Sequence, residues 1–158
     1  MNYKIILAAV CSLILLVGCA PILSATRAQE EKLVKIKTIP GVTQDELFSR
    51  SLSWAARTYN SANDVIQLKD QINGQIVCRG LGSAPMDMGF VRHFRYTMII
   101  DIKEDRIRVR YENIRSEDVG RSAGPDMHYT WKYIENYFHS LSDDLFSSLS
   151  KYKKEKDW

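Results

Sequence analysis

Cysteine is scarce in this chain of 158 residues, which contains only three. Cys11 and Cys19 lie close to the N-terminus, so Cys78 is the only thiol in the body of the chain. A single thiol forms no internal disulfide and falls far short of the ligand set of a structural zinc site. The fold must therefore be stabilised by its hydrophobic core alone.

A strong charge of either sign is also missing. The 22 Lys and Arg residues are nearly balanced by 19 Asp and Glu residues, and the net charge of +3 is too small to indicate a nucleic acid as partner. Paired-carboxylate motifs, a nucleophile elbow and a phosphate-binding loop are absent; residues 79–83 contain glycines, but no helix is expected to follow them. We therefore expect a protein that is not an enzyme and that has no cofactor, metal or nucleic-acid partner.

Long hydrophobic runs are absent except for Ile5–Val17, which is interrupted by Cys11 and Ser12. This run is shorter than the roughly 18–20 residues of a membrane-spanning helix and has the length expected for the apolar region of a secretory signal peptide. It leads into Gly18 and Cys19, and the resulting sequence LVGC resembles the lipobox of bacterial lipoprotein precursors. The alternative is an ordinary signal peptide with an incidental cysteine.

The resemblance to a lipobox implies a location in the bacterial cell envelope. Residues 1–18 would be the signal peptide, with cleavage between Gly18 and Cys19, and Cys19 would carry diacylglycerol and an acyl chain such as palmitate. Two or more acyl chains anchor a protein durably in a membrane. Ala20 replaces the Asp that usually retains such proteins in the inner membrane, which implies the outer membrane, on its periplasmic or its exposed side. We expect residues 19–32 to be a lipid-bearing tether and 33–158 to be one domain.

The first part of this domain is predicted to be a strand followed by a helix. Leu33–Ile39 alternates around Val34 and Ile36, and a proline and a glycine end it. The sequence Thr-Gln-Asp-Glu from residue 43 is a capping box, and apolar residues at helical spacing follow it to about residue 59.

Two hairpins are predicted next. In the first, a loop of three residues at 72–74 would pair Leu68 with Cys78 and Gln67 with Arg79, whereas a two-residue turn would set Leu68 against Arg79. In the second, a turn at residues 104–105 gives the following pairs: Ile102 with Ile107, Ile100 with Val109, Asp101 with Arg108, and Thr97 with Glu112.

A long loop over residues 115–130 and a helix from Trp131 are predicted to complete the chain. If this helix restarts or kinks, we expect it to do so at Ser142-Asp143-Asp144. The order strand, helix, four strands, helix predicts an α+β fold, an antiparallel sheet with both helices packed on one face.

The residues from 33 to about 115 resemble a known family. The stretches GVTQDELF, DVIQLKD and GQIVCRG, together with Trp54 in the predicted helix, are similar to the family of domains of unknown function numbered 4468. This resemblance implies a fold like that of the TATA-box-binding protein, and it brings no activity, cofactor or catalytic residue. The sheet of the TATA-box-binding protein binds DNA, but fold analogy does not transfer function, and an exported, nearly neutral chain argues against DNA.

Few residues are candidates for catalysis or metal binding. His139 and Asp143 are four residues apart on the last predicted helix, but no third ligand is near them in the sequence, and an exposed helix pair fits equally. Asp126 and His128 are in the long loop, where polar residues more often solvate a turn than form a site. Cys78 and His93 are predicted to lie on opposite faces of the sheet, which separates a nucleophile from its base.

The sheet face opposite the helices is the candidate binding site. Alternation places on it the arginines Arg79, Arg95, Arg106, Arg108 and Arg110, interspersed with the aliphatic residues Val65, Val77, Leu81 and Ile99. Arginine mixed with aliphatic residues is typical of interfaces, so we expect this face to dock an envelope protein or an anionic ligand. A solvated face with ordinary charge pairs is the alternative. Another alternative is a small-ligand site or a hydrolytic site in the loops at 83–91 and 115–130.

Overall fold

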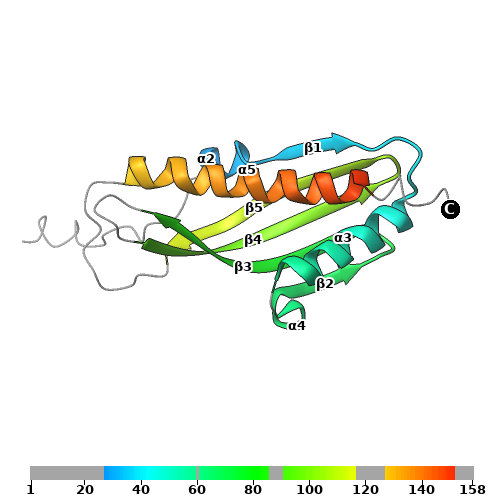
Figure 1. Ribbon diagram of the computed structural model, residues 1–158, viewed down its shortest axis with the longest axis horizontal. Helices are drawn as coiled ribbons and strands as arrows, with labels where there is room; N and C mark the ends of the chain where they lie inside the picture. The colour runs from blue at the N-terminus through cyan, green and yellow to red at the C-terminus, as the bar shows by residue number, and fades with distance from the viewer. Residues whose placement is uncertain (1–26, 60, 86–90, 117–126, 152–158) are drawn as a thin grey trace, which may run out of the picture.

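The computed structural model describes residues 27–59, 61–85, 91–116 and 127–151, which form an antiparallel sheet with α3 and α5 on one side of it (Figure 1). The strands lie in the order β1-β5-β4-β3-β2, which confirms the predicted α+β architecture. No helix within these ranges combines the length and apolar character needed to cross a membrane. The elements in chain order are α2 (Arg27–Glu31), β1 (Lys35–Thr38), α3 (Gln44–Thr58), α4 (Ala62–Val65), β2 (Ile66–Asp70), β3 (Gln75–Pro85), β4 (Val91–Lys103), β5 (Arg106–Ser116) and α5 (Met127–Lys151).

Helix α3 begins where the capping box predicts. The Thr43 hydroxyl accepts a hydrogen bond of 3.3 Å from the backbone N–H of Glu46. Val42 and Leu47 flank this cap and are both buried. Farther along α3, the indole N–H of Trp54 donates to the Asp144 carboxylate of α5 over 2.7 Å, which ties the two helices together.

Strand β1 is present as predicted. The apolar residues on which that prediction was based, however, are exposed and do not face the core. Val34 and Ile36 are 40% and 61% exposed. Lys35 and Lys37 contact the helix layer instead: the Lys35 ammonium lies 2.9 Å from the Asp143 carboxylate, and the Lys37 ammonium lies 5.5 Å from the Phe146 ring centre. Because β1 is at the edge of the sheet, long lysine side chains there can reach solvent and charged partners while their stems pack on apolar surface.

The predicted register of the first hairpin is wrong. Leu68 pairs with Val77, not with Cys78, and Gln67 has no partner because it forms a bulge between Ile66 and Leu68. The Asp70 side chain accepts hydrogen bonds from the backbone and side-chain N–H groups of Asn73, at 3.0 and 2.7 Å. This Asx-type turn extends the loop to residues 71–74 and moves Leu68 to the face opposite the helices, where it is 43% exposed.

The second hairpin has the predicted register, including Asp101 opposite Arg108 and Thr97 opposite Glu112. Its turn is tied to the segment that leads into α3. The Asp105 carbonyl accepts from the backbone N–H of Ile39 at 2.7 Å, and its carboxylate accepts from that of Val42 at 3.1 Å.

Helix α5 is continuous from Met127 to Lys151 and does not restart at Ser142. Ser142 is buried, and its hydroxyl hydrogen-bonds to the Tyr111 hydroxyl at 2.8 Å, so the polar residue that suggested a break is satisfied inside the helix–sheet interface. His128 lies in the first turn of α5 rather than in a loop, whereas Asp126 is outside the described residues.

The core between sheet and helices is rich in aromatic rings, most of which meet edge-to-face. Tyr96 lies at its centre and hydrogen-bonds through its hydroxyl to Tyr59, the residue that caps the C-terminus of α3 (3.1 Å), and to Tyr137 of α5 (3.3 Å). The neighbouring strand β3 makes room for these rings with glycine. A Cβ added at Gly80 would lie 2.2 Å from the Tyr96 ring, and one at Gly82 would lie 2.4 Å from the Phe94 ring.

Two short helices, α2 and α4, were not predicted. Helix α2 occupies part of the expected tether, and its Glu30 carboxylate accepts a hydrogen bond of 3.4 Å from the backbone N–H of Ile114 in β5. The rest of that tether, Cys19 included, lies outside the described residues. Helix α4 contains Val65, which the sequence placed in a strand.

Candidate functional site

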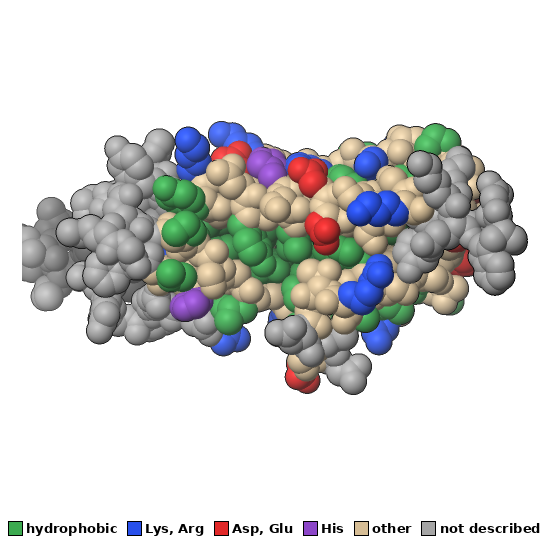
Figure 2. Space-filling view, viewed as in Figure 1, with side chains coloured by type: hydrophobic (Ala, Val, Ile, Leu, Met, Phe, Trp, Pro, Cys, Tyr) green, Lys and Arg blue, Asp and Glu red, His purple; other side chains and the backbone are tan. Residues whose placement is uncertain are grey.

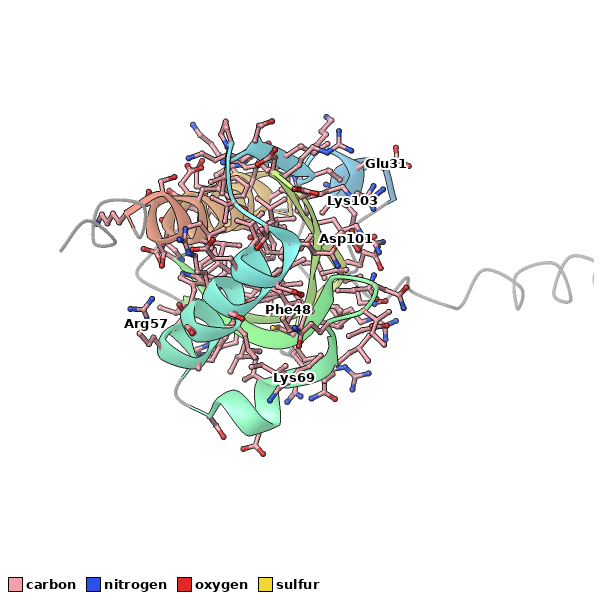
Figure 3. All side chains as sticks on the ribbon, turned by 90° about the vertical axis from the view of Figure 1, so that its right-hand side faces the viewer. Glu31, Phe48, Arg57, Lys69, Asp101 and Lys103 are labelled. Atoms are coloured by element: carbon pink, nitrogen blue, oxygen red, sulfur yellow. The ribbon has the colours of Figure 1, made fainter. Side chains whose placement is uncertain are left out.

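The face of the sheet opposite α3 and α5, called the outer face below, is left uncovered by these two helices, and the short α4 borders it through Asp64 and Val65. Figure 3 shows the sheet nearly edge-on, with both helices on one side and Asp101 and Lys103 on the other. The helix side instead carries interspersed single basic and acidic side chains (Figure 2). The outer face includes Leu68, Val77, Arg79, Leu81, Arg95, Thr97, Ile99, Asp101, Lys103, Arg106, Arg108, Arg110, Glu112 and Arg115.

Two of the predicted binding arginines are already engaged within the outer face. Arg108 donates to one oxygen of Asp101 from Nε and Nη2, at 3.0 and 2.9 Å, and Arg110 donates to the same oxygen at 3.3 Å. Arg110 also pairs with Glu112. Partial burial on its own raises the pKa of Asp101, but hydrogen bonds from Gln75 and Arg108 and the charge of Arg110 outweigh it, so this pKa lies below its usual value. Asp101 and Glu112 thereby neutralise Arg108 and Arg110.

Replacing Asp101 with asparagine should lower the free energy of unfolding at pH 7 by about 1 kcal/mol or less, because the carboxylate is only partly buried and solvent screens its ion pairs. A depressed pKa gives a stabilising contribution that is present above the unfolded pKa and is lost as pH falls through the folded pKa. Urea unfolding of both proteins at pH 7 and pH 3 should therefore show a difference at pH 7 that shrinks at pH 3. A difference that is the same at both pH values would contradict this.

The other half of the outer face is shaped by a bulge in β5 that sequence alternation did not predict. Asn113 and Ile114 together stand opposite Tyr96, and Asn113 has a positive φ of 56°. The extra residue turns Ile114 into the core, where it is 3% exposed, and turns Arg115 outward, directly opposite Arg95. Arg115 is the site residue that the sequence analysis missed. The available signal was the spacing of Tyr111 and Ile114, which breaks the two-residue period.

An open hollow of about 810 Å³ lies on the outer face beside this bulge. Three arginines from three strands line it: Arg79, Arg95 and Arg115. Its described lining contains one acid, Asp64, whose carboxylate accepts a hydrogen bond from Ser61. Neither Arg79 nor Arg115 forms an ion pair with any residue in the described ranges. The remaining lining residues are Val65, Gln67, Gly80, Leu81, Tyr96, Thr97 and Asn113.

Both edges of the sheet are poorly suited to pairing with a strand from another chain. Strand β1 has four residues, two of them lysines, and β2 has five residues interrupted by the bulge at Gln67. Short, charged or bulged edge strands discourage strand addition. A partner would therefore meet the outer face rather than an edge.

Cys78 and His93 lie on opposite faces of the sheet, as the alternation predicted. Cys78 is fully buried, and burial raises the pKa of its thiol to about 11. His93 is exposed and hydrogen-bonds through Nδ1 to the Ser83 hydroxyl at 2.9 Å. A thiol that stays protonated and has no base beside it is a poor nucleophile.

The remaining candidates are not brought together into a site. The His139 Nε2 atom lies 3.7 Å from a carboxylate oxygen of Glu135, and Asp143 forms an ion pair with Lys35. Within the described ranges, no three potential metal ligands gather. Of the two candidate loops, 83–85 belong to β3, and residues 86–90 and 117–126 are outside the described residues.

Known proteins that resemble this chain have the same kind of fold. A family model described as a domain of unknown function (DUF4468) with TBP-like fold matches residues 34–117. A crystal structure of a TBP-like protein from Parabacteroides distasonis superposes with a TM-score of 0.60 at 12% identity, covering 73% of this chain and 90% of that one. A DUF4468 family protein from Bacteroides ovatus gives the same TM-score, identity and coverage of this chain, and 84% coverage of its own. No curated protein matches the sequence.

Proposed function

The chain belongs to the DUF4468 family of domains of unknown function with a TBP-like fold, and on this premise we propose that it is a lipid-anchored lipoprotein of the bacterial envelope. Its domain would be a non-catalytic docking module, and the outer face would bind an acidic surface of an envelope protein. The outer membrane is the proposed location, with the anchor on Cys19. The border of Gly18 and Cys19 after an apolar run supports the lipoprotein part.

The observation that carries the docking part is an uncovered sheet face on which arginines stand beside exposed aliphatic side chains. Leu81 is 56% exposed on β3, two residues after Arg79 and directly opposite Arg95 of β4, and Leu68 is 43% exposed on the neighbouring edge strand. Apolar surface next to arginine is the composition that interface cores favour. The imbalance of charge around Arg79 and Arg115 supports an acidic partner rather than a basic one.

Site-specific cross-linking in intact cells tests the docking function. A photoreactive residue at Leu81 should cross-link to a protein partner, whereas the same residue at Lys132, exposed on the helix side, should not. Adding Arg79→Glu/Arg115→Glu to the Leu81 probe should reduce the cross-linked product by about tenfold or more, because two attractive charges become repulsive. Mass spectrometry of the product identifies the partner and the contacted surface.

The matched control is Arg57→Glu/Lys132→Glu, which changes charge equally on the helix side and should leave the Leu81 product intact. Circular dichroism must show that both double variants fold. If the two double variants reduce the product equally, net charge rather than the outer face is responsible. Cross-linking from Lys132 alone would move the docking surface to the helices.

A further inference from the structure

The chain enters the domain at one fixed end of the sheet. Strand β1 is antiparallel to β5, with Lys35 opposite Val109, so the residues before Lys35 continue toward the C-terminal end of β5. Helix α2 is attached there, because its Glu30 carboxylate accepts a hydrogen bond from the backbone N–H of Ile114. Strand β3 ends, and β4 and α5 begin, at the same end, which is on the left in Figure 1. This tether end comprises residues 27–31, 83–85, 91–93, 114–116 and 127–133.

The tether is short compared with the domain. A fully extended chain from Cys19 to Arg27 spans at most about 29 Å. Strand β5 rises about 30 Å between Ile114, which contacts α2, and the turn at Asp105. With lipid on Cys19 and α2 in its place, the end of the sheet at Asp105 therefore cannot rest on the bilayer, whereas the tether end is held close to it.

The tether end presents apolar and aromatic side chains to solvent. Val91, the first residue of β4, is 55% exposed, and Tyr133 of α5 is 43% exposed. Tyr133 is one helical turn before Tyr137, whose ring packs against that of Phe94 at 5.4 Å, so it lies level with the first residues of β4. Pro85, opposite Val91, is exposed as well. Figure 2 shows hydrophobic side chains gathered at this end of the helix side.

The charges at the tether end suit an anionic lipid surface. Its strands and its part of α5 contain Arg92, Arg115 and Lys132, and no acid occurs in those residues. The acids of this end, Glu30 and Glu31, are on α2, and the Glu30 carboxylate is occupied by a backbone N–H. Exposed aromatic and aliphatic side chains next to basic ones are typical of protein surfaces that lie at the interface of membrane and water.

We propose that the tether end lies on the surface of an anionic bilayer, with Val91 and Tyr133 among the lipid headgroups. The inference rests on the proposed anchor at Cys19 and adds the orientation in which that anchor holds the domain. A contact of this size does not retain a domain by itself, but the short tether gives it a high local concentration of lipid. The strands would then point away from the membrane, which leaves the outer face open to an envelope protein.

A fluorescent amino acid in the mature chain, residues 19–158, tests this orientation. Cys19 is coupled to maleimide-bearing phosphatidylethanolamine in vesicles of phosphatidylethanolamine and phosphatidylglycerol; Cys78 does not compete, because it is fully buried. Lipids that carry a nitroxide at the headgroup should quench a fluorophore at Val91 about twofold or more. The matched control is Ile72, which is 92% exposed in the turn before β3, at the opposite end of the sheet. Quenching there should be less than about one tenth, because the tether is too short.

Two changes show which features make the contact. Adding Tyr133→Ser to the chain labelled at Val91 should reduce the quenching by about half or more, because it removes an interfacial aromatic ring. Ile36→Ser, which removes an exposed apolar side chain from β1 outside the tether end, should leave the quenching unchanged. Vesicles without phosphatidylglycerol should quench the Val91 label less, since the basic residues then lose their anionic partners.

Four results would overturn the proposal. They are equal quenching at positions 91 and 72, quenching at neither or at 72 alone, equal effects of Tyr133→Ser and Ile36→Ser, and quenching that does not depend on phosphatidylglycerol. Because the lipid on Cys19 is attached chemically, none of these results depends on whether cells acylate this residue. They are also independent of whether Leu81 cross-links to a protein, so this proposal and the proposed function fail separately.

Discussion

Cells that produce the chain with Cys19→Ser are expected to release it from the membrane fraction almost completely. The serine hydroxyl does not replace the thiol that a lipobox would present for acylation, so the acyl chains would be lost. Each buried methylene contributes about 0.8 kcal/mol to anchoring. Fractionation at high salt followed by immunoblotting, together with labelling by an alkyne palmitate analogue, measures the change.

Cys11→Ser is the matched control for this prediction. It removes a thiol from the same N-terminal segment, but Cys11 lies inside the apolar run and would leave with the signal peptide. This variant should keep both membrane association and label incorporation. Incorporation of the palmitate analogue into Cys19→Ser would refute lipid anchoring through Cys19, whatever the result with Cys11→Ser.

The two hairpins show what alternation in a sequence can predict. In the second, apolar residues alternate with polar ones from residue 100 of β4 to the turn and from Ile107 to Tyr111 in β5, so only one register buries Ile100, Ile102, Ile107 and Val109 together. In the first, β2 is a short edge strand with few buried side chains, and burial does not fix its register. The hydrogen bonds from Asn73 to Asp70 then decided the loop length, an interaction of two polar side chains that a hydrophobic pattern does not encode.

The sequence predicted which face of the sheet carries the candidate site, but not which of its arginines have acidic partners. Alternation correctly placed Arg79, Arg95, Arg106, Arg108 and Arg110 opposite the helices. It did not predict that Arg110, whose direct cross-strand partner is Ile99, reaches diagonally to Asp101. The predicted alternation also fails after Asn113. The bulge at this residue, with its positive φ, moves each later side chain of β5 to the opposite face from the predicted one. Arg108 and Arg110 therefore have acidic partners on the outer face, whereas Arg79 and Arg115, the latter turned outward by the bulge, do not have them within the described ranges.

Substituting alanine for Gly80 is expected to destabilise the domain by about 2–3 kcal/mol, although alanine normally stabilises a strand position relative to glycine. The added Cβ would lie 2.2 Å from Cζ and 2.4 Å from the hydroxyl of Tyr96. This ring cannot turn away freely, because it packs against Phe138 with ring centres 5.0 Å apart and hydrogen-bonds to Tyr59 and Tyr137. Urea unfolding followed by tryptophan fluorescence gives the free-energy difference.

A double-mutant cycle with Tyr96→Leu distinguishes this clash from a general intolerance of β3 to substitution. Tyr96→Leu is itself destabilising, since it shortens a buried side chain and removes two hydroxyl contacts. In that background the aromatic ring no longer opposes a Cβ at position 80, so Gly80→Ala should cost less than about 0.5 kcal/mol. The coupling energy between the two positions is then about 2 kcal/mol. Equal costs in both backgrounds would mean that glycine at position 80 is required by the backbone of β3, and not by the ring that packs across it.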